Sequence, residues 1–196
     1  MKILLIADEE SPALWDYYRP GALSDCGLIL SAGDLKPEYL SFLVTMANRP
    51  LCYVRGNHDG IYERRPPEGC ECIDGRIVNI NGLRILGLGG SHMYSGGPNQ
   101  YTERQMRRRI RRLALALRRH GGVDIVLSHA PVAGCGDMAD AAHRGFECFR
   151  ELIEKYSPRL WVHGHVHKSY GRDFVRECSL GQTRIVNACG KYELEI

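Results

Sequence analysis

The sequence predicts an α/β protein in which two mixed β-sheets pack face to face and helices cover the outside. Short, continuous apolar runs, typical of strands buried on both faces, alternate with longer helical segments. Two further pairs of runs are joined by tight turns, which indicates antiparallel hairpins beside the parallel strands. The chain has 196 residues, 44% of them hydrophobic and 25% charged. We therefore expect one domain over residues 1–196 with a core of its own.

The elements follow from the pattern in chain order. Five apolar runs predict buried strands, and each ends directly in polar or glycine residues: Lys2–Ala7, Leu28–Ala32, Leu51–Val54, Ile125–Ser128 and Leu160–Val162. Three segments predict helices: Pro37–Ala47, Glu103–His120 and Phe146–Tyr156. The predicted hairpins are Arg76–Ile80 with Leu83–Leu88 around Asn81-Gly82, and Phe174–Cys178 with Thr183–Ala188 around Gly181.

Composition excludes several classes of protein. The net charge of +3 is too small to indicate nucleic-acid binding by itself. The apolar run Ile3–Ala7 is shorter than a signal peptide needs, and no run approaches the roughly 18 residues of a membrane span. We therefore expect a cytoplasmic protein without a membrane partner.

The eight cysteines are accordingly expected to be reduced thiols, although an even number would also suit disulfides. The spacing of Cys70-Glu71-Cys72 disfavours a metal site.

The predicted helix Glu103–His120 is strongly basic. Its apolar residues recur at spacings of four, three and four and form one stripe: Met106, Ile110, Leu113 and Leu117. Eight arginines occupy the rest: Arg104, Arg107, Arg108, Arg109, Arg111, Arg112, Arg118 and Arg119. We expect a solvated outer face. The alternative is a patch for nucleic acid or another polyanion.

Side chains of the metal-ligand type follow the ends of the predicted strands. They are Asp8, Asp34, Asn57, His58, His129, His165 and His167. A single residue of this kind is more often a helix cap or a hydrogen-bonded surface residue. Seven at one edge of a sheet would repel or desolvate one another, and a pair of divalent ions removes that difficulty. Oxygen and imidazole ligands suit Mn²⁺, Fe or Zn²⁺, and two ions about 3.5–4 Å apart can clamp phosphoryl oxygens.

Five motifs now resemble one known family, the calcineurin-like metallophosphoesterases, whose pattern is D-x-H, G-D, G-N-H-[DE], H and G-H-x-H. The matching blocks are Asp8-x-Glu10, Gly33-Asp34, Gly56-Asn57-His58-Asp59, Ser128-His129-Ala130-Pro131 and Gly164-His165-Val166-His167. The third and fifth blocks are the specific ones. The resemblance implies a four-layer α/β sandwich with two mixed β-sheets flanked by helices. It also implies a dinuclear-metal-dependent hydrolase of phosphodiesters or phosphomonoesters.

The resemblance assigns a role to each matching residue. Asp34 would bridge the two metals, Asp8 and His167 would hold the first, and Asn57, His129 and His165 would hold the second. A metal-bridging hydroxide would attack phosphorus. His58 would contact the phosphate and act as general acid for the leaving oxygen. Asp59 would hydrogen-bond His58 and fix its tautomer and pKa.

Glu10 departs from the family pattern, which has His at this position. Glu10 either replaces the imidazole as a ligand of the first metal or points away, in which case Glu9 competes for the place. As a ligand, Glu10 would shift the preference toward Mn²⁺ or Mg²⁺ and away from Zn²⁺. We therefore expect two divalent ions, Mn²⁺ foremost, with Fe, Mg²⁺ and Zn²⁺ as alternatives. We also expect activity to rise toward alkaline pH, because a more negative shell raises the pKa of a bound water.

Candidate substrate contacts lie outside these motifs. The segment Gly87–Tyr101 is rich in glycine, aromatic and amide residues, and His92, Tyr94, Asn99 and Tyr101 are expected to line the substrate cleft. The alternative is a surface connection with turn glycines. His143 precedes the last predicted helix and is expected to contact substrate, unless it is a surface residue near the helix start. Without a large cap domain, the cleft should be open and suit phosphodiesters or accessible phosphate groups.

Two other classes of function stay open. One is a phosphoesterase-fold binding scaffold with weak or no catalysis, which only Glu10 favours. The other is a nuclease, which only the arginine-rich helix favours. The primary expectation is a small phosphoester substrate: a cyclic or small nucleotide, a phospholipid-like diester or a nucleic-acid end. The sequence does not indicate an oligomeric state.

Overall fold

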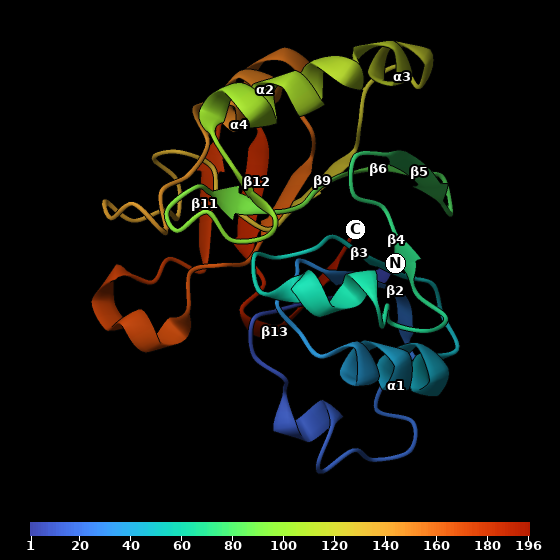
Figure 1. The fold of residues 1–196 in the computed structure, drawn as a ribbon. Helices are drawn as coiled ribbons and strands as arrows, with labels where there is room; N and C mark the ends of the chain where they lie inside the picture. The colour runs from blue at the N-terminus through green and yellow to red at the C-terminus, as the bar shows by residue number, and fades with distance from the viewer.

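The chain folds into a four-layer α/β sandwich, as the sequence predicts (Figure 1). The computed structural model describes the backbone of residues 1–196 and the side chains of residues 1–171 and 174–196. Helix α1 (Pro37–Ala47) covers the outer face of the first sheet. Helices α2 (Glu103–Arg112), α3 (Ala114–Arg119) and α4 (Glu147–Tyr156) cover the outer face of the second. In the described part of the chain, none of the helices has the length and apolar character needed to cross a bilayer.

The first sheet has five strands in the order β13-β1-β2-β3-β4. Their bounds are β1 Lys2–Ala7, β2 Cys26–Ser31, β3 Leu51–Tyr53, β4 Glu71–Cys72 and β13 Gly190–Glu195. Strands β1 to β4 are parallel, and β13 runs antiparallel to β1. The carboxyl ends of β1, β2 and β3 therefore meet at one edge, where ligands bind in open α/β sheets.

The second sheet has six strands in the order β11-β12-β10-β9-β6-β5. Their bounds are β5 Ile77–Ile80, β6 Leu83–Leu88, β9 Ile125–Ser128, β10 Leu160–His163, β11 Glu177–Leu180 and β12 Thr183–Asn187. The four inner strands are parallel, and an antiparallel hairpin closes each side. Both predicted hairpins are present, but the first strand of the second hairpin spans Glu177–Leu180 and not the predicted Phe174–Cys178. Asn81 and Gly82 adopt positive φ angles of 52° and 87°, as a type I′ turn requires.

Strand alternation builds the core in three parts. In β1, Ile3 and Leu5 point into the space between the sheets, whereas Leu4 and Ile6 point toward α1. The second sheet divides its side chains in the same way between the central core and the helices α2 and α4. The inner strands β1, β9 and β10 are thus apolar on both faces, as their continuous apolar runs predict. This packing fixes the two sheets, and with them the loops at their carboxyl ends.

The remaining elements are short. A two-stranded ribbon pairs β7 (Ser91–His92) with β8 (Gln100–Tyr101). Short 3₁₀ helices span η1 Pro12–Leu14, η2 Asp59–Glu63 and η3 Lys168–Asp173.

Three details correct the sequence analysis. The predicted helix Glu103–His120 breaks at Leu113 into α2 and α3, and the break keeps both Leu113 and Leu117 in the core. Strand β13 was not predicted. A disulfide joins Cys135 to Cys178, so the expectation of eight reduced thiols is wrong. The fold brings these two residues together across a separation of 43 positions, which no local pattern reveals, and six cysteines remain free.

Candidate metal centre

The loops that follow the strands hold their polar residues in unusual backbone conformations. Asp8, Asp34 and His165 have φ angles of 64°, 57° and 70°. This left-handed region is sparsely populated by residues other than glycine, and such conformations cluster at functional sites. Three such residues follow β1, β2 and β10. At this edge, the placement of the side chains is therefore kept at the cost of a strained backbone.

Glycines let two of these loops touch. A Cβ atom on Gly33 would press against the backbone of Gly56, and one on Gly56 would overlap the carboxylate of Asp34. The G-D and G-N-H-D motifs therefore pack together only because both positions are glycine.

Asp59 ties the same two loops to each other. Its Oδ2 accepts hydrogen bonds from the backbone N–H of Asp34 at 2.8 Å and of Gly56 at 2.7 Å. This differs from the expected bond between Asp59 and the side chain of His58. Burial, together with the charge of Asp34, raises the pKa of Asp59 to about 6. Through its two hydrogen bonds, Asp59 holds the loops of Asp34 and Gly56 together.

Four polar side-chain atoms face one another, and Nε2 of His129 is the one in contact with the other three. This atom lies 3.0 Å from Asn57 Oδ1, 3.1 Å from His165 Nδ1 and 3.3 Å from Asp34 Oδ2. The tautomers of both imidazoles are fixed from behind, because His129 Nδ1 donates to the Ala32 carbonyl at 2.7 Å and His165 Nε2 donates to the Ala142 carbonyl at 2.7 Å. With neutral imidazoles, all four facing atoms are acceptors. A cation among them satisfies all four at once.

The electrostatics of this cluster also favour a cation. Burial, the largest influence on His129, would lower its pKa, but the carboxylates of Asp34 and Asp8 outweigh it and raise the pKa to about 9. Burial would raise the pKa of Asp34, yet the charge of His129 and the N–H of His58 hold it at about 2. Burial and the charge of His129 lower the pKa of His165 to about 3. A positive charge at His129 Nε2 is thus favoured, and the two nitrogen and two oxygen donors fit a divalent ion.

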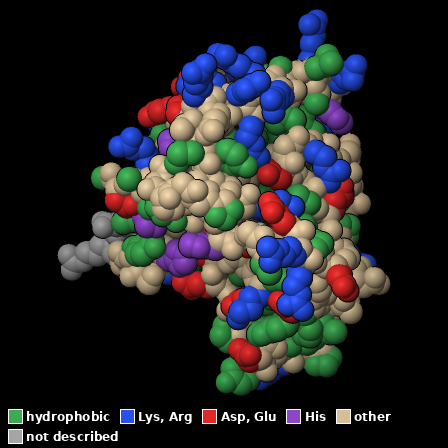
Figure 2. Space-filling view, in the orientation of Figure 1, with side chains coloured by type: hydrophobic (Ala, Val, Ile, Leu, Met, Phe, Trp, Pro, Cys, Tyr) green, Lys and Arg blue, Asp and Glu red, His purple; other side chains and the backbone are tan. Residues whose placement is uncertain are grey.

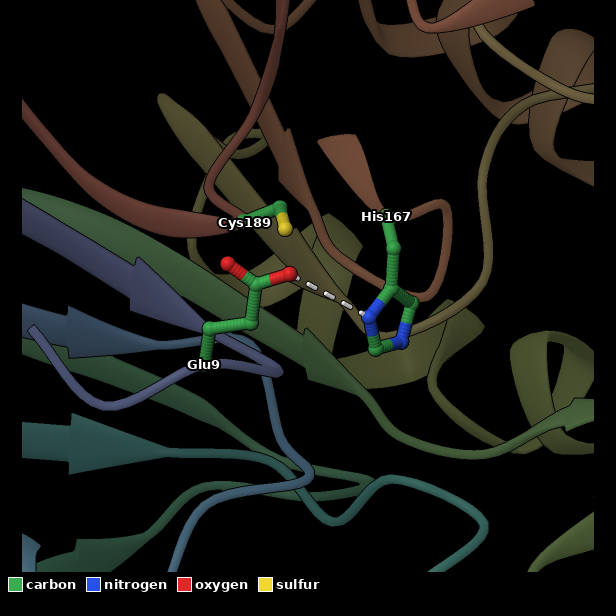
Figure 3. A group of neighbouring side chains, drawn as sticks. All are labelled: Glu9, His167 and Cys189. Atoms are coloured by element: carbon green, nitrogen blue, oxygen red, sulfur yellow. Dashed lines mark ion pairs between the residues drawn. The ribbon is translucent and has the colours of Figure 1, made fainter. Parts of the chain in front are cut away.

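A second group of donors lies beside the first. Glu9 Oε1 is 3.5 Å from His167 Nδ1, and one donor atom from each of Glu9, His167 and Cys189 lies within 4.8 Å of the others (Figure 3). Asp8 accepts the backbone N–H of His165 with both carboxylate oxygens, at 2.9 and 3.0 Å. Burial raises the pKa of Asp8 to about 7. Of the residues that the sequence analysis expected to hold the first metal, His167 belongs to this group.

Glu10 is not part of that group. Its Oε1 lies 3.4 Å from the backbone N of Lys36 and 3.5 Å from Lys36 Nζ. The carboxylate of Glu10 thus pairs with a cation of the chain, which matches the alternative in which Glu10 points away from the first metal. Glu9, the competitor, lies next to His167 instead.

His58 stands at the rim of the centre. Its backbone N–H donates to Asp34 Oδ1 at 2.8 Å, and its side chain is exposed at the start of η2. One hydrogen bond thus fixes the carboxylate of Asp34 relative to the backbone of His58.

Two of the residues expected to line the cleft contact the loop of Asn57 in the candidate centre. Tyr94 Oη accepts a hydrogen bond from Asn57 Nδ2 at 3.1 Å, which turns Asn57 Oδ1 toward His129. Asn99 Nδ2 donates to the Gly56 carbonyl at 2.9 Å, one residue before Asn57. Tyr94 also leaves 41% of its surface exposed.

Of the other three residues expected to contact substrate, only His143 faces the candidate centre. His92 stacks on Phe146 with ring centroids 4.0 Å apart and lies 3.2 Å from the Gly145 carbonyl, so it joins two loops. Tyr101 packs against the Arg109 guanidinium at 4.3 Å. His143 faces the centre, because its ring lies 5.1 Å from that of His165. Its Nδ1 is 2.9 Å from Asp140, and its Nε2 is 3.1 Å from Tyr170 Oη.

Sequence reasoning missed two parts of this centre. Cys189 and Tyr170 were not considered as site residues, and Glu9 appeared only as a competitor. The strand-end rule offered a signal for Cys189, because it follows a strand of the second hairpin. Tyr170 lies in η3, whose position depends on the tertiary fold.

Comparisons with known proteins agree with the motifs. A family model described as "Calcineurin-like phosphoesterase" matches residues 9–169. UPF0046 protein T07D4.2 of Caenorhabditis elegans is 34% identical over 71 residues, which cover 35% of this chain and only 16% of that protein. The crystal structure of TT1561 of Thermus thermophilus superposes with a TM-score of 0.65 at 16% identity, over 96% of this chain and 89% of that one. At this identity the likeness concerns the fold alone.

Proposed function

This chain belongs to the calcineurin-like phosphoesterase family, and from that premise we propose that it hydrolyses a phosphodiester or phosphomonoester with two divalent ions. Members of this family are generally metal-dependent phosphoesterases. The observation that carries the proposal for this chain is the convergence of Asp34, Asn57 and His165 on His129 Nε2 at 3.0–3.3 Å. Both imidazoles keep their lone pairs inward through bonds to backbone carbonyls.

Each residue of the candidate centre has a proposed role in binding metal, substrate or a proton. Asn57, His129 and His165 would hold the second ion, Asp34 would bridge, and Asp8, His167 and Glu9 would hold the first. Bound divalent ions would supply positive charge for the phosphoryl oxygens and lower the pKa of the attacking water. His58, exposed at the rim, would donate a proton to the leaving oxygen. Asp59 keeps the loops of Asp34 and Gly56 together. His143, with Tyr170, would contact the substrate.

The preferred metal is also a proposal. The group around His129 has two nitrogen and two oxygen donors, which suit Mn²⁺ and leave Fe or Zn²⁺ as alternatives. The argument for Mn²⁺ from Glu10 loses its basis, since that side chain pairs with Lys36.

Hydrolysis of bis-p-nitrophenyl phosphate tests the proposed activity. Metal-stripped protein should be inactive, and Mn²⁺ should restore turnover. His58→Ala should lower kcat by about 10²–10⁴-fold, because a general acid typically contributes that much. His120→Ala is the matched control: His120 is an exposed histidine after α3, and its loss should leave kcat unchanged.

Two outcomes would overturn the proposal. Turnover that survives thorough metal removal would exclude the metal centre as its source. A protein that binds two metal ions but cleaves neither diester nor monoester model substrates would favour the binding-scaffold alternative.

A nuclease stays a second candidate because of the helical layer. Figure 2 shows Lys and Arg side chains gathered over this layer, and Arg104, Arg108, Arg111 and Arg112 of α2 are exposed. Arg109 is not available to a ligand in this way, since its guanidinium contacts Asp74 at 2.6 Å and the Gly89 carbonyl at 2.7 Å.

Charge reversal tests the nuclease alternative. If the helix binds nucleic acid, Arg104, Arg108 and Arg112 changed together to Glu should weaken binding of a DNA or RNA oligonucleotide and flatten its salt dependence. Binding should be followed by fluorescence anisotropy over about 50 to 200 mM salt. Unchanged binding and an unchanged salt slope would remove the basis of this candidate.

A further inference from the structure

We propose that Cys189 is a thiolate ligand of the first metal, beside Glu9 and His167, and that it makes this position prefer Zn²⁺ over Mn²⁺ and Mg²⁺. The inference rests on the proposed metal-dependent function and deepens it, because it assigns different metals to the two positions. The position around His129 has only nitrogen and oxygen donors, whereas this one adds sulfur.

Three separate chain segments bring these donors together. Glu9 follows β1, His167 follows β10, and Cys189 lies between β12 and β13. Figure 3 shows their side chains facing a common space, with Glu9 Oε1 3.5 Å from His167 Nδ1. One donor atom of each lies within 4.8 Å of the others. A buried cysteine usually packs as a small apolar residue, yet this sulfur has a carboxylate and an imidazole as neighbours.

The backbone holds Cys189 in place for this role. Its N–H donates to Asn187 Oδ1 at 2.8 Å, and Asn187 Nδ2 donates to the Val166 carbonyl at 2.9 Å. Asn187 therefore links the turn of Cys189 to the residue just before His167. Arg176 binds the Cys189 carbonyl with two nitrogens, each at 3.1 Å. A ligand fixed by such bonds needs little rearrangement to bind an ion.

The rest of the first position explains why sulfur is needed there. Position 10 carries no imidazole, and the Glu10 carboxylate pairs with Lys36. The donors that the structure groups at this position are Glu9, His167 and Cys189. Binding of an ion M²⁺ replaces the S–H bond with an S–M bond and releases the proton to solvent. Soft thiolate ligands select Zn²⁺ over hard ions such as Mg²⁺ and Mn²⁺.

Cobalt spectroscopy tests the ligand directly. The metal-stripped chain is titrated with Co²⁺ and followed by absorption. The wild type should show a near-ultraviolet sulfur-to-cobalt charge-transfer band, and Cys189→Ser should lose it while still binding Co²⁺ at the His129 position. Cys70→Ser is the matched control, because Cys70 is a free cysteine in the loop before β4, and it should keep the band. A band that persists in Cys189→Ser would overturn the proposal.

A second measurement needs no variant. X-ray absorption of wild-type protein loaded with two equivalents of Zn²⁺ should reveal a sulfur scatterer at about 2.3 Å from zinc. Two bound zinc ions with only nitrogen and oxygen scatterers would overturn the proposal even if Cys189→Ser failed to fold.

Metal competition tests the consequence. With equal concentrations of Zn²⁺ and Mn²⁺ in equilibrium dialysis, the wild type should retain zinc at one position, and Cys189→Ser should lose at least about tenfold of that preference. These readouts do not depend on turnover. Protein that shows the sulfur ligand but hydrolyses no phosphate ester would overturn the proposed function and leave this inference standing.

Discussion

At the scale of single residues, the orientation of each ligand depends on a partner behind it. The Ala32 and Ala142 carbonyls turn the lone pairs of His129 and His165 inward, and Tyr94 turns the amide of Asn57. Such partners fix tautomer and rotamer before an ion arrives, which lowers the cost of ordering on binding. The sequence motif names the ligands and is silent on these partners.

Tyr94→Phe tests the support of Asn57. Removal of the phenolic oxygen leaves Asn57 Nδ2 without its bond at 3.1 Å, so the amide is free to rotate. Loss of such a supporting bond typically weakens metal affinity about 10- to 100-fold, and we expect about tenfold for Mn²⁺ in a competition titration. Tyr17→Phe, at an exposed tyrosine, should have no effect. Equal affinities for wild type and Tyr94→Phe would contradict the assigned role.

The sequence could not decide which of Glu9 and Glu10 lies next to His167. Glu9 and Glu10 are adjacent carboxylates, and the motif spacing favours Glu10. Which of them reaches His167 depends on the left-handed backbone of Asp8 and on the position of Lys36 across the loop. Neither is visible in a local pattern.

At the scale of elements, the predicted strands and helices are mostly confirmed because their signals are local. Continuous apolar runs mark β1 and β9 with their observed bounds, and Pro37 marks the first residue of α1. Strand β13 was missed because it is an edge strand with exposed charged residues, and its pairing with β1 is set by the whole fold. The break at Leu113 follows from packing on the second sheet, which an uninterrupted helical stripe does not reveal.

One ion pair joins three elements and makes a pH-dependent prediction. Arg84 of β6 binds both carboxylate oxygens of Asp124 at 2.7 and 2.8 Å and also the carbonyls of His120 and Gly121 after α3. The hydrogen bonds from Arg84 hold the pKa of Asp124 below its usual value. This contribution is therefore present above the unfolded pKa of about 3.9 and is lost as pH falls through the lower folded pKa.

Asp124→Asn should accordingly reduce the free energy of unfolding by about 1–2 kcal/mol at pH 7. Below about pH 4 the difference from wild type should shrink, since the wild-type carboxyl then becomes protonated as well. Urea unfolding at about pH 7 and about pH 3 measures both. Asp16→Asn, at an exposed position, is the control and should change little. A difference that stays constant with pH would contradict the ion-pair account.

At the scale of the whole molecule, the sandwich brings together residues that lie far apart in the chain. The first sheet supplies Asp8, Asp34 and Asn57, and the second supplies His129 and His165, all from carboxyl ends of parallel strands. The sequence predicted this convergence because strand ends and motif order are local and specific. It did not predict the disulfide between Cys135 and Cys178 or the approach of Cys189 to His167. Both contacts join segments that lie far apart in the chain and depend on the tertiary fold.

Anomalous X-ray diffraction tests the central claim most directly. Crystals of wild-type protein would be grown with Mn²⁺ or with Zn²⁺, and data would be collected at the absorption edge of each metal. The account predicts an anomalous peak bounded by Asp34, Asn57, His129 and His165, and a second peak beside His167. Crystals that hold either metal elsewhere, with no peak among His129, Asn57 and His165, would contradict it.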